Sequence, residues 1–192
     1  NVKYIPRDLD IPHKNYFQFF KEPDNLIHLA WSGLPHYSDL FHIEKNLYSN
    51  YFFIKNIIRG GLKNILVAGT CFEYGMSRGC LSEEMETMPM NAYGLAKDTL
   101  RRFIEELSKK YPFVHKWVRI FYVYGKGQSQ NAIIPQLERA LARKQKIFNM
   151  SKGNQVRDYL PVEKIAEYIV KIALQNKING AINCCSGKPI TI

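Results

Sequence analysis

Short apolar segments alternate with amphipathic segments along this chain, and that alternation constrains the fold more than any other feature. Residues 25–30 and 64–69 are short apolar runs, whereas residues 43–58 and 92–110 carry apolar side chains at helical spacing. Residues 114–124 form another apolar run. Strands that alternate with helices in this way pair in parallel, because each helix carries the chain back across one face of the sheet. We therefore expect an α/β fold built on a parallel sheet.

The last third of the chain has a different pattern. We expect an amphipathic helix over residues 133–143, a strand over residues 147–150 and a second helix that starts at Pro161. A final strand is expected over residues 181–185. The section after about residue 126 is expected to close over a substrate.

The charge balance is basic. The chain has 27 Lys and Arg residues against 17 Asp and Glu residues, which gives a net charge of +10. Such a balance suits partners that carry phosphate groups. The charges are scattered, however, and no segment combines basic with aromatic side chains as a nucleic-acid module does, so we expect no nucleic-acid partner.

Signals for membranes, secretion and metals are missing from the sequence. No apolar run approaches about 18 residues, and the charged residues within 1–21 do not fit a signal peptide. The four cysteines form no Cys-x-x-Cys pair, so we expect neither a disulfide framework nor a metal site. His36 and His42 lack partners at ligand spacing and are expected at the surface. The sequence therefore predicts a soluble cytoplasmic protein without membrane contact.

The pattern Tyr-x-x-x-Lys is a candidate for catalytic chemistry. On a helix its two side chains lie one turn apart on one face. A lysine ammonium in that position lowers the pKa of the phenol, so that the tyrosine can exchange a proton with a substrate oxygen. The pattern occurs three times, at Tyr51/Lys55, Tyr93/Lys97 and Tyr122/Lys126.

The sequence context separates these three pairs. Tyr51 lies on the apolar stripe of its helix, which favours core packing. Tyr122 is at a strand end, where Lys126 is not one helical turn away. Tyr93 opens a helix after a loop, and the preceding buried strand ends at Thr70, so the two hydroxyl groups can converge on one carbonyl or alcohol. Tyr93 is therefore the expected catalytic tyrosine.

Several segments resemble motifs of the extended short-chain dehydrogenases/reductases, and they occur in that family's order. Residues 91–97 resemble the Pro-Tyr-Gly-x-Ser/Ala-Lys helix start, and residues 67–75 are similar to the strand that ends in Ser/Thr and then Tyr-Gly. Residues 28–30 resemble the His-Leu-Ala segment that passes beside the cofactor. Further similar segments are residues 119–128, 156–162 and 182–187.

The resemblance implies a fold and a division of the chain. It implies a Rossmann-like doubly wound parallel sheet whose N-terminal strands are missing, because no Gly-x-x-Gly-x-x-Gly loop occurs in these residues. Residues 1–126 would form a partial cofactor-binding domain that carries the catalytic Thr, Tyr and Lys. Residues 127–192 would mainly bind substrate, with segments that return to the core sheet. Either the protein is a fragment, or an N-terminal half precedes these residues.

The resemblance also implies which residues form the site. The catalytic residues would be Thr70, Tyr93 and Lys97. The cofactor, NAD or NADP, would contact Asp8, Leu9, Leu29 and Ala30 as well as Tyr93 and Lys97. The substrate, a nucleotide-diphosphate sugar, would contact Cys71, Tyr122 and Arg157.

The implied reaction is that of a 4-ketoreductase or an epimerase acting on the sugar. Sugar dehydratases of the family have acidic residues directly after the catalytic Thr; this chain has Cys71 and Phe72 there, and Glu73 is one residue too late, which disfavours dehydration. The alternative is a non-catalytic binding or scaffold protein, or an inactive fragment. Arg157, which in the family holds the nucleotide diphosphate, has a second interpretation as an ion-pair partner of Asp158.

Two further expectations concern the helices. The helices over residues 43–58 and 92–110 resemble those through which family members pair, so we expect a homodimer. Asn46 matches a helix Asn of the family that braces the active-site helix.

Overall fold

The structure is a computed structural model that describes residues 2–192, and these divide into two compact units. The first unit comprises the chain up to Arg119 together with Ile169–Asn183. The second comprises Ile120–Tyr168 together with Cys184–Ile192. The division therefore falls a few residues before the boundary expected at residue 126, and a late segment returns to the first unit.

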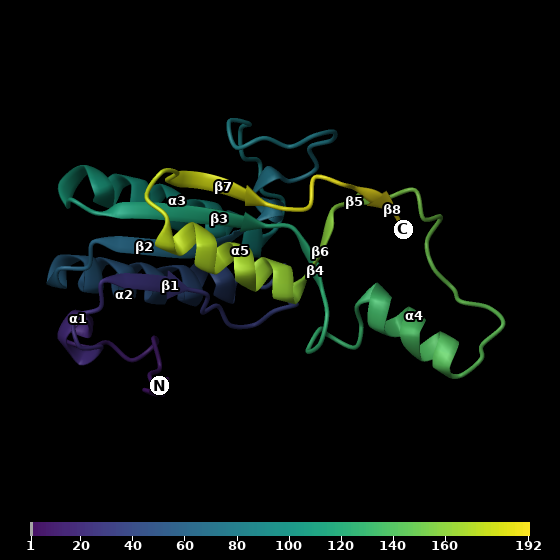
Figure 1. Ribbon diagram of the computed structural model, residues 1–192, viewed down its shortest axis with the longest axis horizontal. Coiled ribbons are helices and arrows are strands. Elements are labelled where there is room, and N and C mark those ends of the chain that lie inside the picture. The colour runs from purple at the N-terminus through teal and green to yellow at the C-terminus, as the bar shows by residue number, and fades with distance from the viewer. Residues whose placement is uncertain (1) are drawn as a thin grey trace. The chain divides into compact units, whose positions relative to one another are not determined.

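A four-stranded sheet organises the first unit. Its order is β1 (Asn25–His28), β2 (Asn64–Thr70), β3 (Val114–Ile120) and β7 (Gly180–Cys184). β1 and β2 pair in parallel, and the arrows of all four strands run in the same direction (Figure 1). The parallel α/β sheet expected from the sequence is confirmed.

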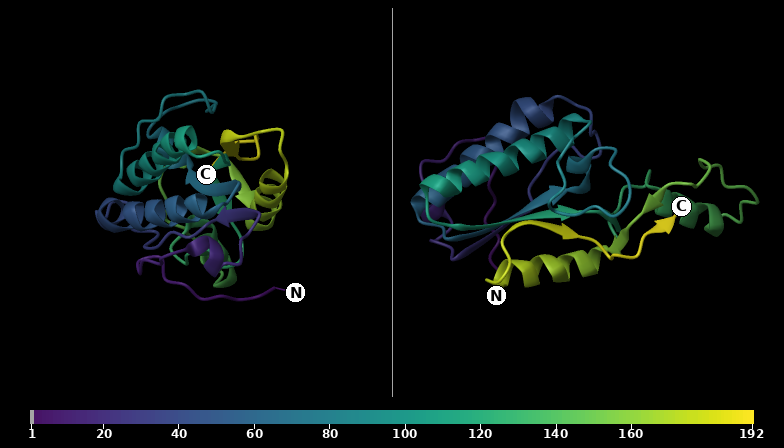
Figure 2. Two further views of the ribbon diagram at one scale, coloured as in Figure 1. Left: turned by 90° about the vertical axis from the view of Figure 1, so that its left-hand side faces the viewer. Right: turned by 90° about the horizontal axis from the view of Figure 1, so that it is seen from above.

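Helices cover both faces of this sheet. A π-helical turn η1 (His42–Asn46) leads into α2 (Leu47–Gly60), which lies beside α3 (Ala92–Lys110) on one face (Figure 2). The C-terminal half of α5 (Val162–Leu174) lies on the opposite face. Two short helices complete the unit, α1 (Tyr16–Phe19) and the 3-10 turn η2 (Cys71–Tyr74).

Local signals set the bounds of the long helices. The Asn91 side chain accepts a hydrogen bond from the Gly94 N–H at 2.8 Å and caps the start of α3. At the end of α2, Gly61 adopts a φ of 132°, a conformation that suits glycine and stops the helix.

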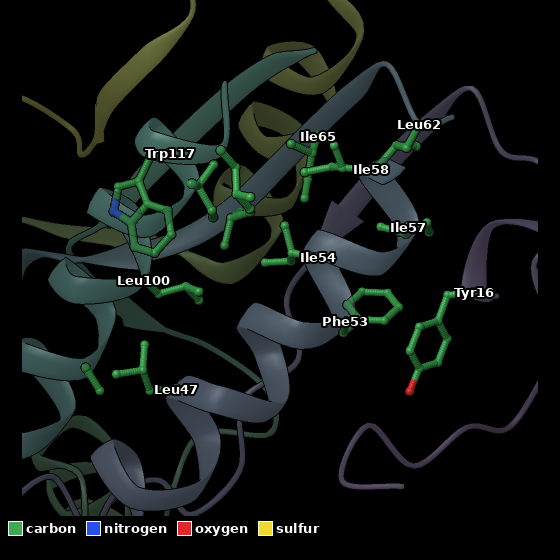
Figure 3. Packing of buried hydrophobic residues seen from close by; sticks show 14 residues of the cluster. Tyr16, Leu47, Phe53, Ile54, Ile57, Ile58, Leu62, Ile65, Leu100 and Trp117 are labelled. Carbon is green, nitrogen blue, oxygen red and sulfur yellow. The ribbon is translucent and has the colours of Figure 1, made fainter. Parts of the chain in front are cut away.

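The hydrophobic core fills the space between the sheet and the α2/α3 face (Figure 3). Ile54 and Ile57 of α2 are fully buried, and Leu100 of α3 packs into the same cluster as Trp117 of β3. The remaining buried members are Tyr16, Leu47, Phe53, Ile58, Leu62, Ile65, Val67, Ala96, Ile104 and Leu107. This core fixes α3 against the carboxyl end of β2.

The second unit contains two small sheets and a helix. β4 (Tyr122–Tyr124) pairs in parallel with β6 (Tyr159–Pro161), and β5 (Val156–Arg157) pairs antiparallel with β8 (Ile190–Thr191). The helix is α4 (Ile133–Ala142). None of the helices formed by residues 2–192 is long and apolar enough to cross a membrane.

Three expectations about strands and helix ends were wrong. The single strand expected over residues 114–124 is two strands, because the backbone changes partner: the Phe121 N–H donates to Cys184 O, and the Tyr122 N–H donates to Asp158 O. Residues 147–150 form no strand and pair with no neighbouring strand in the part of the chain that the structure describes. Pro161 ends β6 rather than starting the helix, which begins at Val162.

Candidate active site

Thr70, Tyr93 and Lys97 meet at the carboxyl end of β2. Thr70 is the last residue of this strand, Tyr93 is the second residue of α3, and Lys97 follows one helical turn later. The side chains of Tyr93 and Thr70 are close enough for the Thr70 hydroxyl to act on the pKa of Tyr93. In parallel α/β sheets the carboxyl ends of the strands are where ligands bind. The convergence of the two hydroxyl groups expected from the sequence is therefore present, while their catalytic role stays a prediction.

The Tyr93 hydroxyl lies in a low-polarity environment. Its side chain is buried, and burial raises the pKa of Tyr93 above its ordinary value. The nearby Thr70 hydroxyl acts in the opposite direction on that pKa, whereas Tyr37, Glu73 and Cys71 add to the increase. At neutral pH Tyr93 therefore keeps its proton and can donate it.

Lys97 is a buried cation with few polar neighbours. Its Nζ donates a hydrogen bond to Ala68 O at 2.8 Å and lies 4.0 Å from the centre of the Trp31 ring. Burial lowers the pKa of Lys97 to about 7, and the negative charge of Glu73 acts to raise it. An ammonium has three N–H donors, so one bond to Ala68 leaves donors for a hydroxyl-bearing ligand.

Glu73 was considered in the sequence only as a possible dehydratase acid, and its contacts beneath Thr70 were not expected. Its carboxylate is fully buried and accepts three hydrogen bonds, from Thr70 N–H at 2.8 Å, Trp117 Nε1 at 2.9 Å and Arg119 Nε at 2.7 Å. Burial raises the pKa of Glu73, and the bond to Arg119 acts to lower it. Glu73 thus fixes the backbone of Thr70. The Thr-x-x-Glu spacing of a capping box could have indicated this contact.

His42 was expected at the surface, and this prediction was wrong. His42 is fully buried, with its Nδ1 accepting a hydrogen bond from Trp31 Nε1 at 3.0 Å. One turn later, the Asn46 side chain exchanges hydrogen bonds with Ser32 rather than with α3. Burial of His42 depends on contacts with the loop after β1, and no local pattern indicates it. His36, in contrast, is exposed as expected.

The residues expected to contact the cofactor lie at two places in the first unit. Leu29 and Ala30 are exposed directly after β1, next in sequence to Trp31. Asp8 is exposed in the N-terminal segment and accepts a hydrogen bond from the Asp10 N–H, while Leu9 packs against the core cluster. Their roles in cofactor binding stay predictions.

The residues expected to contact substrate are divided between the two units. Cys71 directly follows Thr70 in η2 of the first unit. In the second unit the Arg157 guanidinium lies 5.1 Å from the centre of the Tyr122 ring. Asp158 accepts hydrogen bonds from the backbone N–H groups of residues 186 and 187, and within residues 2–192 no ion pair joins it to Arg157. The alternative interpretation of Arg157 as a partner of Asp158 is therefore wrong.

Within the described residues the structure contains neither a candidate metal-binding group nor a disulfide. Across residues 2–192, no group of three His, Cys, Asp or Glu side chains is placed to hold a metal ion. The four cysteines, all within the described part of the chain, form no disulfide.

Comparison with known proteins gives consistent matches. The model of the NAD dependent epimerase/dehydratase family matches residues 6–185. A dTDP-6-deoxy-L-talose 4-dehydrogenase (NAD(+)) of Aggregatibacter actinomycetemcomitans is 31% identical over 165 residues, which cover 85% of this chain and 60% of that protein. A GDP-6-deoxy-D-talose 4-dehydrogenase of the same organism is 26% identical over 172 residues, which cover 86% of this chain and 57% of that protein.

Solved structures share the fold. MoeE5 in complex with UDP-glucuronic acid and NAD gives a TM-score of 0.81 at 21% identity, covering 97% of this chain and 64% of that chain. This similarity confirms the expected Rossmann-like fold. The chain spans about 60% of the length of the curated relatives described above. On the match over residues 6–185, this chain belongs to the NAD-dependent epimerase/dehydratase family.

Proposed function

We propose that this chain provides the catalytic centre of an NAD-dependent oxidoreductase that acts on a nucleotide-linked sugar. The observation that carries the proposal is the convergence of the Thr70 and Tyr93 side chains at the end of β2, with Lys97 one helical turn away. Two hydroxyl groups and an ammonium at one sheet edge suit proton exchange with an alcohol or carbonyl of a substrate. NAD is preferred to NADP because a 31% identical relative is named as an NAD(+) enzyme.

Each of the three side chains has a distinct role in this proposal. Tyr93 exchanges a proton with the sugar oxygen, and Thr70 donates a hydrogen bond to the same oxygen as it gains negative charge. Lys97 uses its remaining N–H donors to hold hydroxyl groups of the cofactor ribose and favours loss of the Tyr93 proton. NAD, when bound, accepts or returns the hydride. Leu29, Ala30, Asp8 and Leu9 are proposed to line its binding site.

The reaction at C4 of the sugar is favoured over dehydration. Both curated relatives named above are 4-dehydrogenases, so we propose oxidation of a 4-hydroxyl or, in reverse, reduction of a 4-keto sugar. Glu73 accepts three hydrogen bonds and is fully buried, so it is not available for the acid–base steps of a dehydratase. An epimerase would use the same residues but recycle its cofactor, whereas a dehydrogenase changes the nicotinamide absorbance in proportion to product.

A substitution of Tyr93 tests the proposal, and the chain contains a matched control. In the complete protein as the cell makes it, Tyr93→Phe should lower turnover of a nucleotide sugar with NAD by roughly 10²–10⁴-fold, the usual contribution of a general acid–base group. Tyr51→Phe alters the Tyr-x-x-x-Lys pair on α2, where the Lys55 Nζ lies 5.5 Å from the Tyr51 ring centre, and should leave turnover unchanged. Equal turnover of Tyr93→Phe and the wild type would favour the non-catalytic binding or scaffold protein.

The nucleotide diphosphate of the substrate is proposed to bind Arg157, and Tyr122 and Cys71 are proposed to contact the sugar. A guanidinium is planar and presents its donors in one plane, which suits a diphosphate, and packing on the Tyr122 ring holds that plane in one orientation. A hydrogen bond to a charged group contributes about 1.5–3 kcal/mol of binding free energy. Loss of this contribution in Arg157→Ala should therefore raise KM for the nucleotide sugar about tenfold or more. An unchanged KM would exclude this role.

We also propose that the protein is a homodimer that pairs through α2 and α3. A cytoplasmic location is proposed as well, because it suits an enzyme that uses nucleotide substrates. Tyr48 and Phe52 of α2 are exposed aromatic side chains, and Leu95 of α3 is an exposed apolar one. Phe52→Glu should convert a dimer to a monomer in light scattering, whereas Leu137→Glu, at another exposed apolar position, should not. A monomeric wild type at high concentration would exclude the dimer.

A further inference from the structure

Trp31, in the loop after β1, is the aromatic neighbour of Lys97. The centre of its ring lies 4.0 Å from Lys97 Nζ, within the range in which a cation is attracted to an aromatic face. The same ring meets the Tyr93 ring edge-on, with the ring centres 6.0 Å apart. Trp31 therefore contacts both members of the Tyr-x-x-x-Lys pair that the proposed function uses.

A hydrogen bond to His42 fixes the orientation of the Trp31 ring. The indole Nε1–H donates to His42 Nδ1 at 3.0 Å. The other ring nitrogen of His42, Nε2, lies 3.0 Å from the backbone oxygen of His36, an acceptor, so Nε2 carries the proton and Nδ1 is free to accept. Asn46 Nδ2 lies 3.3 Å from the same Nδ1, which is consistent with this tautomer.

His42 lies in a segment with an unusual backbone conformation. His42 begins the π-helical turn η1, a form that is rare and often occurs at functional sites. Its side chain is fully buried, and burial lowers the pKa of His42 below its ordinary value. His42 therefore stays neutral near pH 7, and its Nδ1 remains an acceptor for Trp31.

Lys97 has few other sources of stabilisation for its charge. A buried ammonium loses its water shell, and Ala68 O is its hydrogen-bond acceptor in the structure. The charged and titratable groups that face it from the surrounding elements are Glu73 of η2, His28 of β1 and His42 of η1. Both histidines have lowered pKa values, so near pH 7 Glu73 is the charged member of this set.

From this geometry we propose that Trp31 is a positioning residue for Lys97, with its ring face carrying the ammonium group and His42 holding the ring in place. The inference rests on the proposed function, in which Lys97 holds the cofactor ribose and acts on Tyr93. Through Trp31, the loop after β1 would set both the direction and the charge of the catalytic lysine. The role differs from core packing, because it depends on the ring face and on the indole N–H.

Titration of Lys97 by NMR tests this inference without any catalytic assay. In the folded protein with isotope-labelled lysine, the Lys97 side-chain signal is followed against pH in the wild type, in Trp31→Leu and in Trp31→Phe. Trp31→Leu removes the ring and should lower the midpoint by about one pH unit, a tenfold loss of proton affinity. Trp31→Phe keeps a weaker ring face without the N–H anchor and should give a smaller shift in the same direction.

Controls separate this inference from a structural role and from the proposed function. Tyr111→Leu removes another aromatic ring near a lysine, with Lys110 Nζ 5.9 Å from the ring centre, and should leave the Lys97 midpoint unchanged. In the complete protein, the pH profile of kcat/KM should shift in Trp31→Leu by the same amount as the NMR midpoint. An unchanged Lys97 midpoint in a folded Trp31→Leu or Trp31→Phe variant would overturn the inference. If instead Tyr93→Phe is fully active while the midpoint shifts, the proposed function fails and the contact stands.

Discussion

Replacement of the buried Lys97 by methionine should stabilise the protein, and more so at low pH. The pKa of Lys97 falls from 10.5 in the unfolded chain to about 7 in the folded protein, mainly through burial. Each pKa unit corresponds to about 1.4 kcal/mol, so burial of the charged form destabilises the fold by about 5 kcal/mol below pH 7. Methionine has a similar length and carries no charge.

The sign of the pH dependence follows from proton binding. Between about pH 7 and pH 10.5 the unfolded state binds more protons at this residue than the folded state does, so wild-type stability rises with pH. At about pH 6 nearly the whole destabilisation is present, whereas at about pH 9 roughly 2 kcal/mol remains. The stability advantage of Lys97→Met over the wild type should therefore shrink by about 3 kcal/mol across this window.

Urea unfolding at the two pH values, followed by tryptophan fluorescence, measures this difference. Lys55→Met removes one positive charge from α2 without altering the buried ammonium and controls for the net charge. Parallel pH dependence of the unfolding free energy in the wild type and in Lys97→Met would refute the reasoning. Lys97→Met should also abolish turnover if the proposed function holds, which would show a residue kept for activity at the expense of stability.

Three further substitutions test the structure by urea unfolding. Burial lowers the pKa of His28 from 6.5 to about 4, so wild-type stability should fall by about 3 kcal/mol as the pH drops through this range. His28→Gln should lack this fall, which would assign it to protonation of His28. Glu73→Gln leaves a buried guanidinium without its charged partner and should destabilise by about 3–5 kcal/mol, whereas Glu106→Gln, in an exposed ion pair, should change stability by at most about 1 kcal/mol. In Gly75→Ala the added methyl group would overlap a backbone carbonyl oxygen, whereas in Gly79→Ala it would meet no atom. Both glycines have a positive φ, so the backbone strain is similar, and Gly75→Ala should be the more destabilising change. Equal losses of stability in the two variants would contradict the packing around Gly75.

Local patterns were sufficient to locate α3, the helix that carries Tyr93 and Lys97. The helix expected over residues 92–110 has the bounds of α3, because a capping Asn91, apolar residues at helical spacing and a basic last turn all act within one segment. The buried strand that ends at Thr70 was expected for the same reason, as a continuous apolar run. From these two segments, the order of the chain alone predicted that Thr70 and Tyr93 would meet.

Contacts between distant segments account for what the sequence missed. Glu73 and Arg119 are 46 residues apart, and their ion pair exists because β2 and β3 are neighbours in the sheet. The strand expected over residues 114–124 breaks where the backbone finds new partners, a choice that no local propensity encodes.

The sequence by itself determined the parallel α/β fold and the bounds of the helix that carries Tyr93 and Lys97, because periodicity and capping act over a few residues. Only the tertiary structure decided the environment of that pair. The burial that lowers the pKa of Lys97, the ring of Trp31 and the buried acceptor on His42 come from three separate elements. Charge and solvation depend on which segments exclude water from a side chain, and that is settled only when the elements pack.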